Sequence, residues 1–197
     1  KMAYTLGYTL SRSGAITVSG MARGIDSTVA IGSLNALGKT VAVLGCGIDI
    51  AYPRENAKLM NRIIENGAVI TEYPPHTPPN SYNFPVRNRI ISGISNATVI
   101  VEGSTDSGAM ITARSAIEQG KTLFAIPGPA RRHSSSGPNQ LIKHNDAILA
   151  RDATDILSPF ATQFRDKIDF LKAKERPTFS KSAIQAEAGD VDKHKLF

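Results

Sequence analysis

Two arginines lie in a stretch whose apolar residues repeat like the buried side of a helix. In "NFPVRNRIISGIS", residues 83–95, Val86, Ile90 and Ile94 recur every four residues, and we predict that this stripe faces the core. Arg87 and Arg89 lie in the first turns of the same helix. A charged group is costly to bury without a partner. The helix start therefore faces either internal carboxylates or a cleft that binds an anion.

The spacing of the two arginines separates them around the helix. Pro85 suits a first turn, so both lie near the N-terminal end. At the helical period they are roughly 200° apart and cannot both point into one small pocket. One arginine faces the cleft while the other pairs with a carboxylate, or both form structural ion pairs. The candidate carboxylates are Glu72, Glu102 and Asp106.

Glycine-rich loops follow several of the expected strands. Glycines let backbone amides approach a phosphate, and the N-terminus of a helix adds partial positive charge. In "GMARGID" two glycines bracket an arginine, "GCGID" offers a second close approach, and "SGAM" opens a helix. The loops predict an anion-binding rim that contains Gly20, Arg23, Gly24, Gly47, Ser107 and Gly108.

Phe84 stands immediately before Pro85, after the loop "PPHTPPNSYN". The prolines and asparagines of this loop disfavour regular structure, so Phe84 enters the fold from an exposed connection. Its side chain either staples the loop to the new helix or serves as a stacking platform for a nucleic-acid base. Both roles remain open on the sequence alone.

The surrounding chain alternates short β-branched runs with helical patterns. This alternation predicts parallel strands with crossover helices, hence an α/β, Rossmann-like, doubly wound sheet with helices on both faces. Ligands of such sheets collect outside the carboxyl ends of the strands, where the glycine loops lie. The expected strands are 15–20, 40–45, 68–72, 97–103, 122–128 and 147–150, and the expected helices are 25–38, 55–67, 83–95 and 107–120.

The pattern predicts a Rossmann-like domain over residues 1–157 and a linker or flexible tail over 158–197. The chain opens inside a helical pattern, "MAYTLGYTLSRSG", so we expect a first strand and its loop to belong upstream of it. Gly38 and Gly67 are expected to end helices.

The basic composition suits either a polyanionic partner or an ordinary basic soluble protein, and the sequence lacks the signatures of several classes of site. The net charge is +6 and the pI about 9.5. No apolar run is long enough to cross a membrane, no secretory signal opens the sequence, and the single cysteine, Cys46, suits the reducing cytoplasm. The histidines lack metal-type spacing, no P-loop is present, and the dinucleotide fingerprint fails at Ile50. We therefore expect no metal and no cofactor.

Several stretches together resemble the DNA-processing protein A (DprA/Smf) family over about residues 5–157. The most specific is the FPxRNRIIxG pattern at 84–93, and the glycine loops alone would not suffice. Two departures from the family pattern are Ala30, where a histidine is frequent, and "HND" at 144–146. The stretches are "SGMARGID" (19–26), "GCGIDIAYPRENAKL" (45–59), "ITEYPP" (70–75), "FPVRNRIISGIS" (84–95), "VIVEGSTDSGAMITARSAIEQGKTLFAIPG" (99–128) and "SGPNQLI" (136–142).

The resemblance implies an extended Rossmann fold that binds single-stranded DNA without cleaving it, dimerises, and loads the RecA recombinase during natural transformation. It implies roles in or beside the DNA pocket for Arg23, Phe84, Arg87 and Arg89. It also implies a Gly-(Ser/Thr)-Arg loop before Lys1 and, in many members, a winged-helix domain after the tail. The alternative is an enzyme, a nucleotide-binding lysine-decarboxylase-like phosphoribohydrolase, with Glu102 as the better acid/base candidate and Glu72 as the other. Its P-G-G-x-G-T-x-x-E motif is not matched by "EGSTDSGAMITA".

Overall fold

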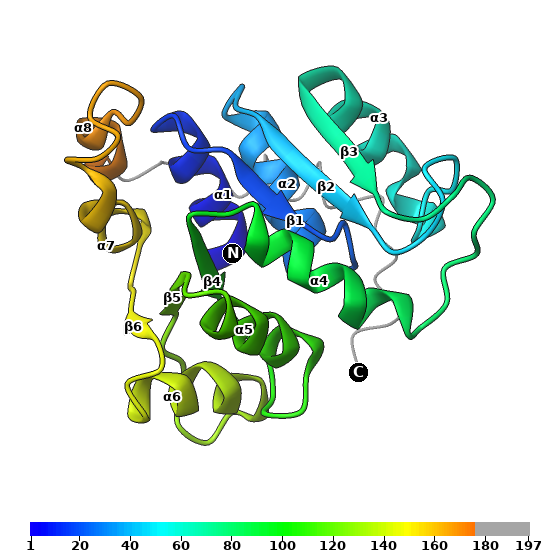
Figure 1. The fold of residues 1–197 in the computed structure, drawn as a ribbon. Coiled ribbons are helices and arrows are strands. Elements are labelled where there is room, and N and C mark those ends of the chain that lie inside the picture. Colours follow the sequence, from blue (N-terminus) through cyan, green and yellow to red (C-terminus); the bar gives the residue numbers. More distant parts are fainter. Residues whose placement is uncertain (176–197) are drawn as a thin grey trace.

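The computed structural model describes residues 1–175 as alternating strands and helices (Figure 1). The strand pairs within these described residues are all parallel, as predicted. The strands are β1 (Thr17–Ser19), β2 (Thr40–Leu44), β3 (Gly67–Thr71), β4 (Ala97–Ile100), β5 (Thr122–Ala125) and β6 (Ile148–Leu149). The helices are α1 (Met2–Arg12), α2 (Ile25–Asn35), α3 (Ala57–Asn66), α4 (Asn83–Gly93), α5 (Gly108–Glu118), α6 (Ser136–Lys143), α7 (Ala153–Leu157) and α8 (Phe170–Lys174), with short 3-10 turns at Arg54–Asn56, His133–Ser135 and Ser158–Phe160.

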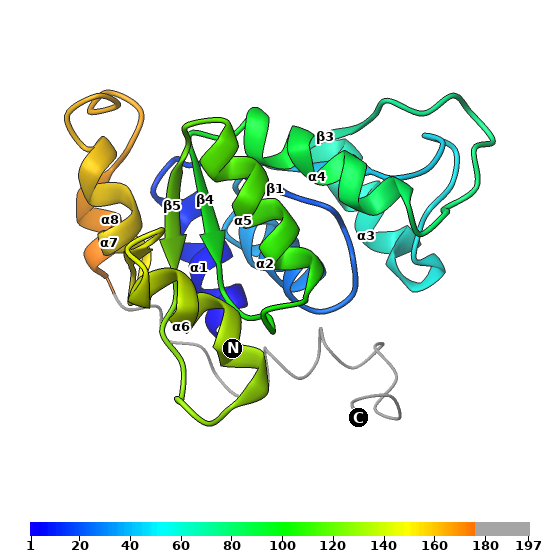
Figure 2. The same cartoon turned by 60° about the horizontal axis from the view of Figure 1, so that its bottom comes forward.

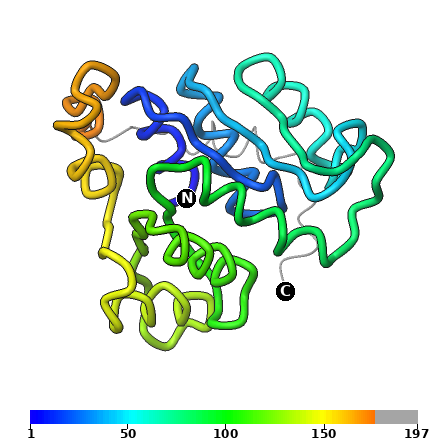
Figure 3. Tube along the Cα trace, in the orientation of Figure 1, coloured from blue at the N-terminus to red at the C-terminus, as the bar shows by residue number. Residues whose placement is uncertain are grey.

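The strands form two three-stranded sheets, ordered β1-β2-β3 and β4-β5-β6. A doubly wound sheet would be continuous across its middle, but here β1 and β4 are both edge strands. The chain crosses from the first sheet to the second through the loop after β3 and then α4, as Figure 3 shows. The predicted fold class is confirmed, with the difference that its sheet is split.

Helices cover one face of the first half and both faces of the second (Figure 2). In the first half, α2 and α3 supply Leu34, Leu59 and Ile63 to a core with Ala42 and Leu44 of β2. In the second half, α5 and α6 bury one face of β4 and β5. α1 and α7 pack on the opposite face through a cluster that includes Leu6, Phe124 and Ile156.

The apolar stripe predicted for α4 does not face the core. Val86 is 50% exposed and Ile94 52%, whereas Arg87 is only 4% exposed. The buried side of α4 carries Asn83, Arg87 and Ser92. Asn83 and Arg87 lie against strand ends, where backbone carbonyls need donors, and Ser92 donates to carbonyls of its own helix. Asn83, for example, donates to the Gly45 carbonyl at 2.9 Å.

Beyond residue 157 the described chain folds back onto α1. The Asp169 amide donates to the Ser13 carbonyl at 2.9 Å, and Arg12 pairs with Glu175 at 2.7 Å. The expected division at residue 158 stays a prediction, and most of the expected tail lies outside the described residues. No helix within residues 1–175 is both long and apolar enough to span a membrane.

Candidate nucleic-acid interface

A cleft of about 1050 Å³ opens between the two sheets. Its walls reach the carboxyl ends of β1 and β4, where the sequence predicted the ligand. Of the predicted rim residues, the cleft brings together Gly20, Arg23, Phe84, Arg87 and Gly108. Gly24, Gly47, Arg89 and Ser107 lie outside its lining.

The turn after β1 already holds an anion, the carboxylate of Asp26. The amides of Gly20 and Ala22 donate to Asp26 Oδ2 at 2.9 and 3.3 Å. Burial raises the pKa of Asp26, although these amides and the nearby Arg87 charge act in the opposite direction. The expectation that the Gly20 loop offers free amides to a phosphate is therefore corrected, because an internal carboxylate occupies them.

Gly20 has a different role, which is to admit the Arg87 side chain. A Cβ at Gly20 would lie 2.4 Å from Arg87 Nη2. Arg87 Nη1 donates to the Gly20 carbonyl at 2.9 Å and also to the Val43 carbonyl. Burial lowers the pKa of Arg87, and Asp26 opposes that shift. Arg87 thus ties α4 to the ends of β1 and β2, and its guanidinium is not a freely exposed phosphate ligand.

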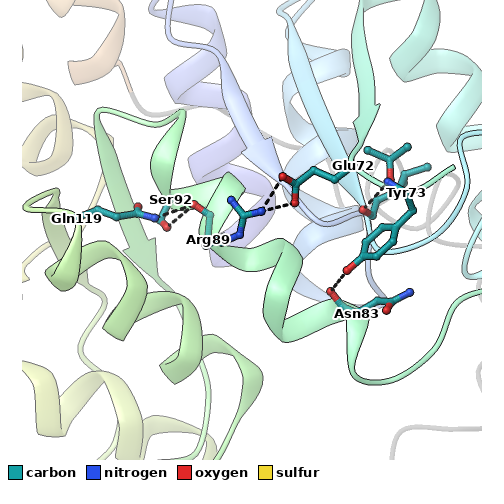
Figure 4. Close-up of polar contacts among 8 residues, drawn as sticks. Glu72, Tyr73, Asn83, Arg89, Ser92 and Gln119 are labelled. Carbon is teal, nitrogen blue, oxygen red and sulfur yellow. Dashed lines mark hydrogen bonds and ion pairs between the residues drawn. The ribbon is translucent and has the colours of Figure 1, made fainter.

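Arg89 forms the predicted carboxylate pair. Its Nη2 lies 2.6 and 2.5 Å from the two Glu72 carboxylate oxygens, with both side chains about half exposed (Figure 4). Gln119, the residue that follows α5, donates to the Arg89 carbonyl at 2.9 Å. Figure 4 also shows the Tyr73 hydroxyl directed at the Asn83 carbonyl, 3.4 Å away. Arg89 therefore fastens α4 to the end of β3 and α5.

Arg23 is the exposed arginine of the cleft. Its side chain pairs with Glu55, which raises the pKa of Arg23 and lowers that of Glu55. The phenol of Tyr52 also lies close enough to raise the pKa of Arg23 slightly. An exposed pair of this kind is weak and exchanges partners readily, so Arg23 can still meet a phosphate.

Phe84 belongs to a stack of aromatic and cationic groups. The Tyr52 ring lies 5.4 Å from the Phe84 ring at 19° between planes, and the Arg87 guanidinium carbon lies 5.8 Å from the Phe84 centroid. Phe84 also fits against Gly45, where a Cβ would come within 2.7 Å of the ring. Most of Phe84 is thereby covered, whereas Tyr52 is 37% exposed and lines the cleft.

Sequence reasoning missed Tyr52. It follows the "GCGID" loop closely, and nothing in its neighbours marks it as a partner of Phe84. A signal was available in the same quoted motif, "GCGIDIAYP", which places an aromatic residue after a strand end. The geometry makes Tyr52 the outer ring of the pair.

The remaining predicted glycines differ in what surrounds them. A Cβ at Gly47 would lie 2.7 Å from the His76 amide nitrogen and 2.9 Å from the Pro74 carbonyl, so Gly47 serves close packing of two loops. Its amide already donates to the Thr77 carbonyl, which corrects the expectation of a free amide. Gly24 has φ +85° and open space around it, and Gly108 is also open.

Ser107 occupies the N-cap position of α5 without a side-chain capping bond, and its hydroxyl donates to the Ser104 carbonyl at 2.7 Å. Asn88 of α4 donates to the Gly108 carbonyl at 3.4 Å. The N-terminus of α5 therefore stands at the cleft mouth, with Gly108 in its lining and Ser107 behind it.

Glu102, the better acid/base candidate of the enzyme alternative, already has an ion-pair partner and a hydrogen-bond donor. Glu102 Oε1 lies 3.0 Å from Arg132 Nη2 and accepts from the Ser134 hydroxyl at 3.0 Å. Across residues 1–175 no group of three or more histidine, cysteine, aspartate or glutamate side chains could hold a metal ion.

Comparison with known proteins identifies the family of this chain. Residues 1–161 match the family described as DNA recombination-mediator protein A. The chain belongs to this family. Protein Smf of Escherichia coli is 45% identical over 150 residues, which cover 76% of this chain and 40% of that protein. The DNA processing protein DprA of Streptococcus pneumoniae is 39% identical over 145 residues, which cover 74% of this chain and 51% of that protein.

Solved structures of two members share the fold. DprA from Streptococcus pneumoniae superposes with a TM-score of 0.74 at 35% identity, over 80% of this chain and 55% of that one. DprA from Helicobacter pylori is described as having a unique single-stranded DNA binding mode. It superposes with a TM-score of 0.74 at 28% sequence identity, over 82% of this chain and 73% of that one. A molybdenum cofactor carrier protein from Chlamydomonas reinhardtii superposes with a TM-score of 0.52 at 19% sequence identity, which indicates a shared fold alone. The chain spans about half or less of the length of the curated relatives named here.

Proposed function

We propose that the cleft mouth binds single-stranded DNA and that the protein acts in DNA uptake without cleaving DNA. In this role it would protect incoming strands in the cytoplasm and, as a homodimer, load the RecA recombinase during natural transformation. Support comes from family membership and from the Helicobacter pylori relative, which is described as binding single-stranded DNA. The observation on this chain that carries the proposal is the exposed Tyr52 ring stacked on Phe84 beside Arg23.

The chemistry of this group suits an unpaired base. Bases in a single strand stack on aromatic rings, and cations beside the rings hold the phosphates without reading sequence. Duplex bases are already stacked on one another and cannot use the ring. The Phe84 ring stacks against the inner side of the Tyr52 ring, and Arg23 lies beside Tyr52. Across the cleft, the N-terminus of α5 at Gly108 offers partial positive charge. Arg87 acts by positioning Phe84 and Gly20, and Arg89 by holding α4.

The test is a fluorescence-anisotropy titration with a labelled oligothymidine and a duplex of the same length. Tyr52→Ala is expected to weaken single-strand binding by about 5- to 150-fold, the span of about 1–3 kcal/mol per stacked base, with little change for duplex. Tyr52→Phe keeps the ring and should be nearly neutral. Tyr82→Ala is the matched control, because Tyr82 is 69% exposed and lies outside the cleft lining.

Phe84→Ala is expected to resemble Tyr52→Ala on single strands, since Tyr52 loses its support. Thermal melting of each variant separates a binding loss from unfolding. Wild-type protein that binds duplex as tightly as single strands would contradict the proposed function. A nucleoside monophosphate hydrolysis assay, with Glu102→Gln beside wild type, tests the enzyme alternative, and turnover lost in that variant would establish it.

A further inference from the structure

The two stacked rings stand on different parts of the chain. Tyr52 lies in the loop between β2 and the 3-10 turn at Arg54, residues 45–53, which we call the β2 loop. Phe84 lies in the first turn of α4, directly after the loop of residues 72–82, which we call the β3 loop. The ring centroids are 5.4 Å apart. Their spacing therefore depends on how the β2 loop and the β3 loop are joined.

Asp49 joins the two loops through both of its carboxylate oxygens. Oδ1 accepts a hydrogen bond from the His76 amide at 2.8 Å, and Oδ2 lies 2.6 Å from His76 Nδ1. These contacts lower the pKa of Asp49, and the hydrogen bond from the His76 amide is the largest cause. Asp49 is therefore ionised at neutral pH and holds one residue of the β3 loop at two points.

The packing around Gly47 leaves this contact little room to shift. A Cβ at Gly47 would lie 2.6 Å from Asp49 Oδ1 and 2.7 Å from the His76 amide nitrogen. The Ile50 amide donates back to the Gly47 carbonyl at 3.1 Å, so the backbone of the β2 loop turns between the two residues. The loops are thus locked together shortly before the chain reaches Tyr52.

His76 makes this contact from a backbone conformation that an ordinary residue avoids. Its φ is +66°, in the left-handed region that is costly for a residue with a side chain. The side chain is 89% exposed, so burial does not offset that cost. In this conformation the amide and the imidazole both reach the same Asp49 carboxylate. Strain kept at an exposed residue suggests a function for the contact that it makes.

We propose that Asp49 is a positioning residue for the stacked rings. By holding His76, it fixes the β2 loop, which carries Tyr52, against the β3 loop, which leads to Phe84. Asp49 and His76 lie outside the cleft lining, whereas both rings line it. Asp49 therefore acts through Tyr52 and not on the bound strand. The inference rests on the proposed function, because it concerns how the base-stacking ring is held in place.

The charge of Asp49 predicts the opposite effect on DNA binding. A carboxylate near a nucleic-acid site opposes the phosphates, so Asp49→Ala would by charge alone strengthen binding to any strand, with or without bases. Loss of the positioning contact weakens binding only where a base stacks on Tyr52. The sign of the effect on a strand with bases separates these two roles.

The test is an anisotropy titration of the 197-residue chain with labelled oligothymidine and with an abasic strand of the same length. Asp49→Ala is expected to weaken oligothymidine binding by about 3- to 30-fold, a part of the stacking contribution of one base, and not to weaken abasic binding. Asp49→Asn keeps an acceptor for the His76 amide and should retain most of the binding. Asp106→Ala is the matched control, because it removes an exposed carboxylate from the loop before α5 and should affect both strands alike.

A spectroscopic measurement reports on the ring itself. The fluorescence of 2-aminopurine falls when this base stacks on an aromatic ring. With a strand that contains 2-aminopurine and protein at saturation, we expect less quenching by Asp49→Ala than by wild type.

Two results would overturn the inference while the proposed function stands. One is an Asp49→Ala protein that prefers oligothymidine over the abasic strand as strongly as wild type does. The other is unchanged quenching of 2-aminopurine at saturation. Equal losses on the two strands, together with a lowered melting temperature, would assign Asp49 to the stability of the fold and also overturn it. Wild-type protein that binds the two strands equally would instead remove the base-stacking function, and the positioning role with it.

Discussion

Arg87 lies where α4 meets the ends of two neighbouring strands, and its hydrogen bonds hold that corner together. It donates to the Gly20 and Val43 carbonyls while its charge faces the carboxylate of Asp26 across the buried turn. Arg89, two residues later, reaches an exposed carboxylate instead. The same residue type therefore has a buried role and a surface role within one helical turn.

This difference predicts unequal effects on stability. Arg87→Ala leaves two carbonyls without their donor and Asp26 without its nearby cation, and we expect a loss of about 2–5 kcal/mol in the free energy of unfolding. Arg89→Ala removes an exposed pair and should cost about 1 kcal/mol or less. Urea denaturation of both variants measures the two losses side by side. A larger loss for Arg89→Ala would show that the surface pair is the structural one.

At the scale of elements, the end of α2 carries strain at an exposed residue. The Leu37 amide donates to the Leu34 carbonyl and the Gly38 amide to the Ser33 carbonyl, both at 3.0 Å, the pattern of a Schellman end. The residue with positive φ is Leu37 (56°), not the glycine that follows. Leu37 is 96% exposed, so its side chain gains almost nothing from burial to offset that conformation.

Leu37→Asn is therefore expected to stabilise the protein. A left-handed conformation costs an ordinary residue about 1–2 kcal/mol, and asparagine tolerates it better. We expect a gain of about 0.5–1 kcal/mol, or about 1–4 °C in melting temperature for a chain of this size. Leu37→Ala is the control, since it shortens the side chain without relieving the backbone. Equal melting temperatures for the asparagine and alanine variants would count against the strain.

At the scale of the whole molecule, the net charge of +6 is accompanied by ion pairs around the cleft. In the cleft lining, Arg23 is paired with Glu55, and Glu102 is paired with Arg132. The Arg89–Glu72 pair lies outside the lining. A bound strand must compete with these carboxylates, so few phosphates can be neutralised at once. The surface therefore favours modest, salt-sensitive binding.

We expect the logarithm of single-strand affinity to fall with the logarithm of salt concentration, by about 0.7 for each phosphate neutralised. Arg23→Ala should reduce this slope by about one such step, because it removes one exposed cation from the cleft. Glu55→Gln is the complementary variant and should strengthen binding at low salt by freeing Arg23. Anisotropy titrations at several salt concentrations give the slopes, and an affinity that does not respond to salt would rule out the charged rim.

The sequence by itself determined the order of elements, the parallel pairing and the end of the sheet at which the candidate ligand site lies. These follow from periodicity and from glycine at strand ends, which are local properties. It also supplied Glu72 as a partner for an arginine of α4, and the Arg89 pair confirms this. The family resemblance, carried by motifs such as "FPVRNRII", is confirmed as well.

Only the tertiary structure decided which groups meet. Periodicity places Val86 and Ile94 on one side of α4, but what lies opposite depends on distant strands, and their carbonyls selected Arg87 for the buried side. Asp26 fills the turn that the sequence left open to phosphate, because the start of α2 brings its carboxylate back onto amides earlier in the chain. Tyr52 meets Phe84 across a strand and a helix of intervening chain. The cleft separates β1 from β4, between which β2, β3 and the helices α2, α3 and α4 intervene in the sequence. Contacts of this range depend on how the elements pack together, which no local pattern of residues records.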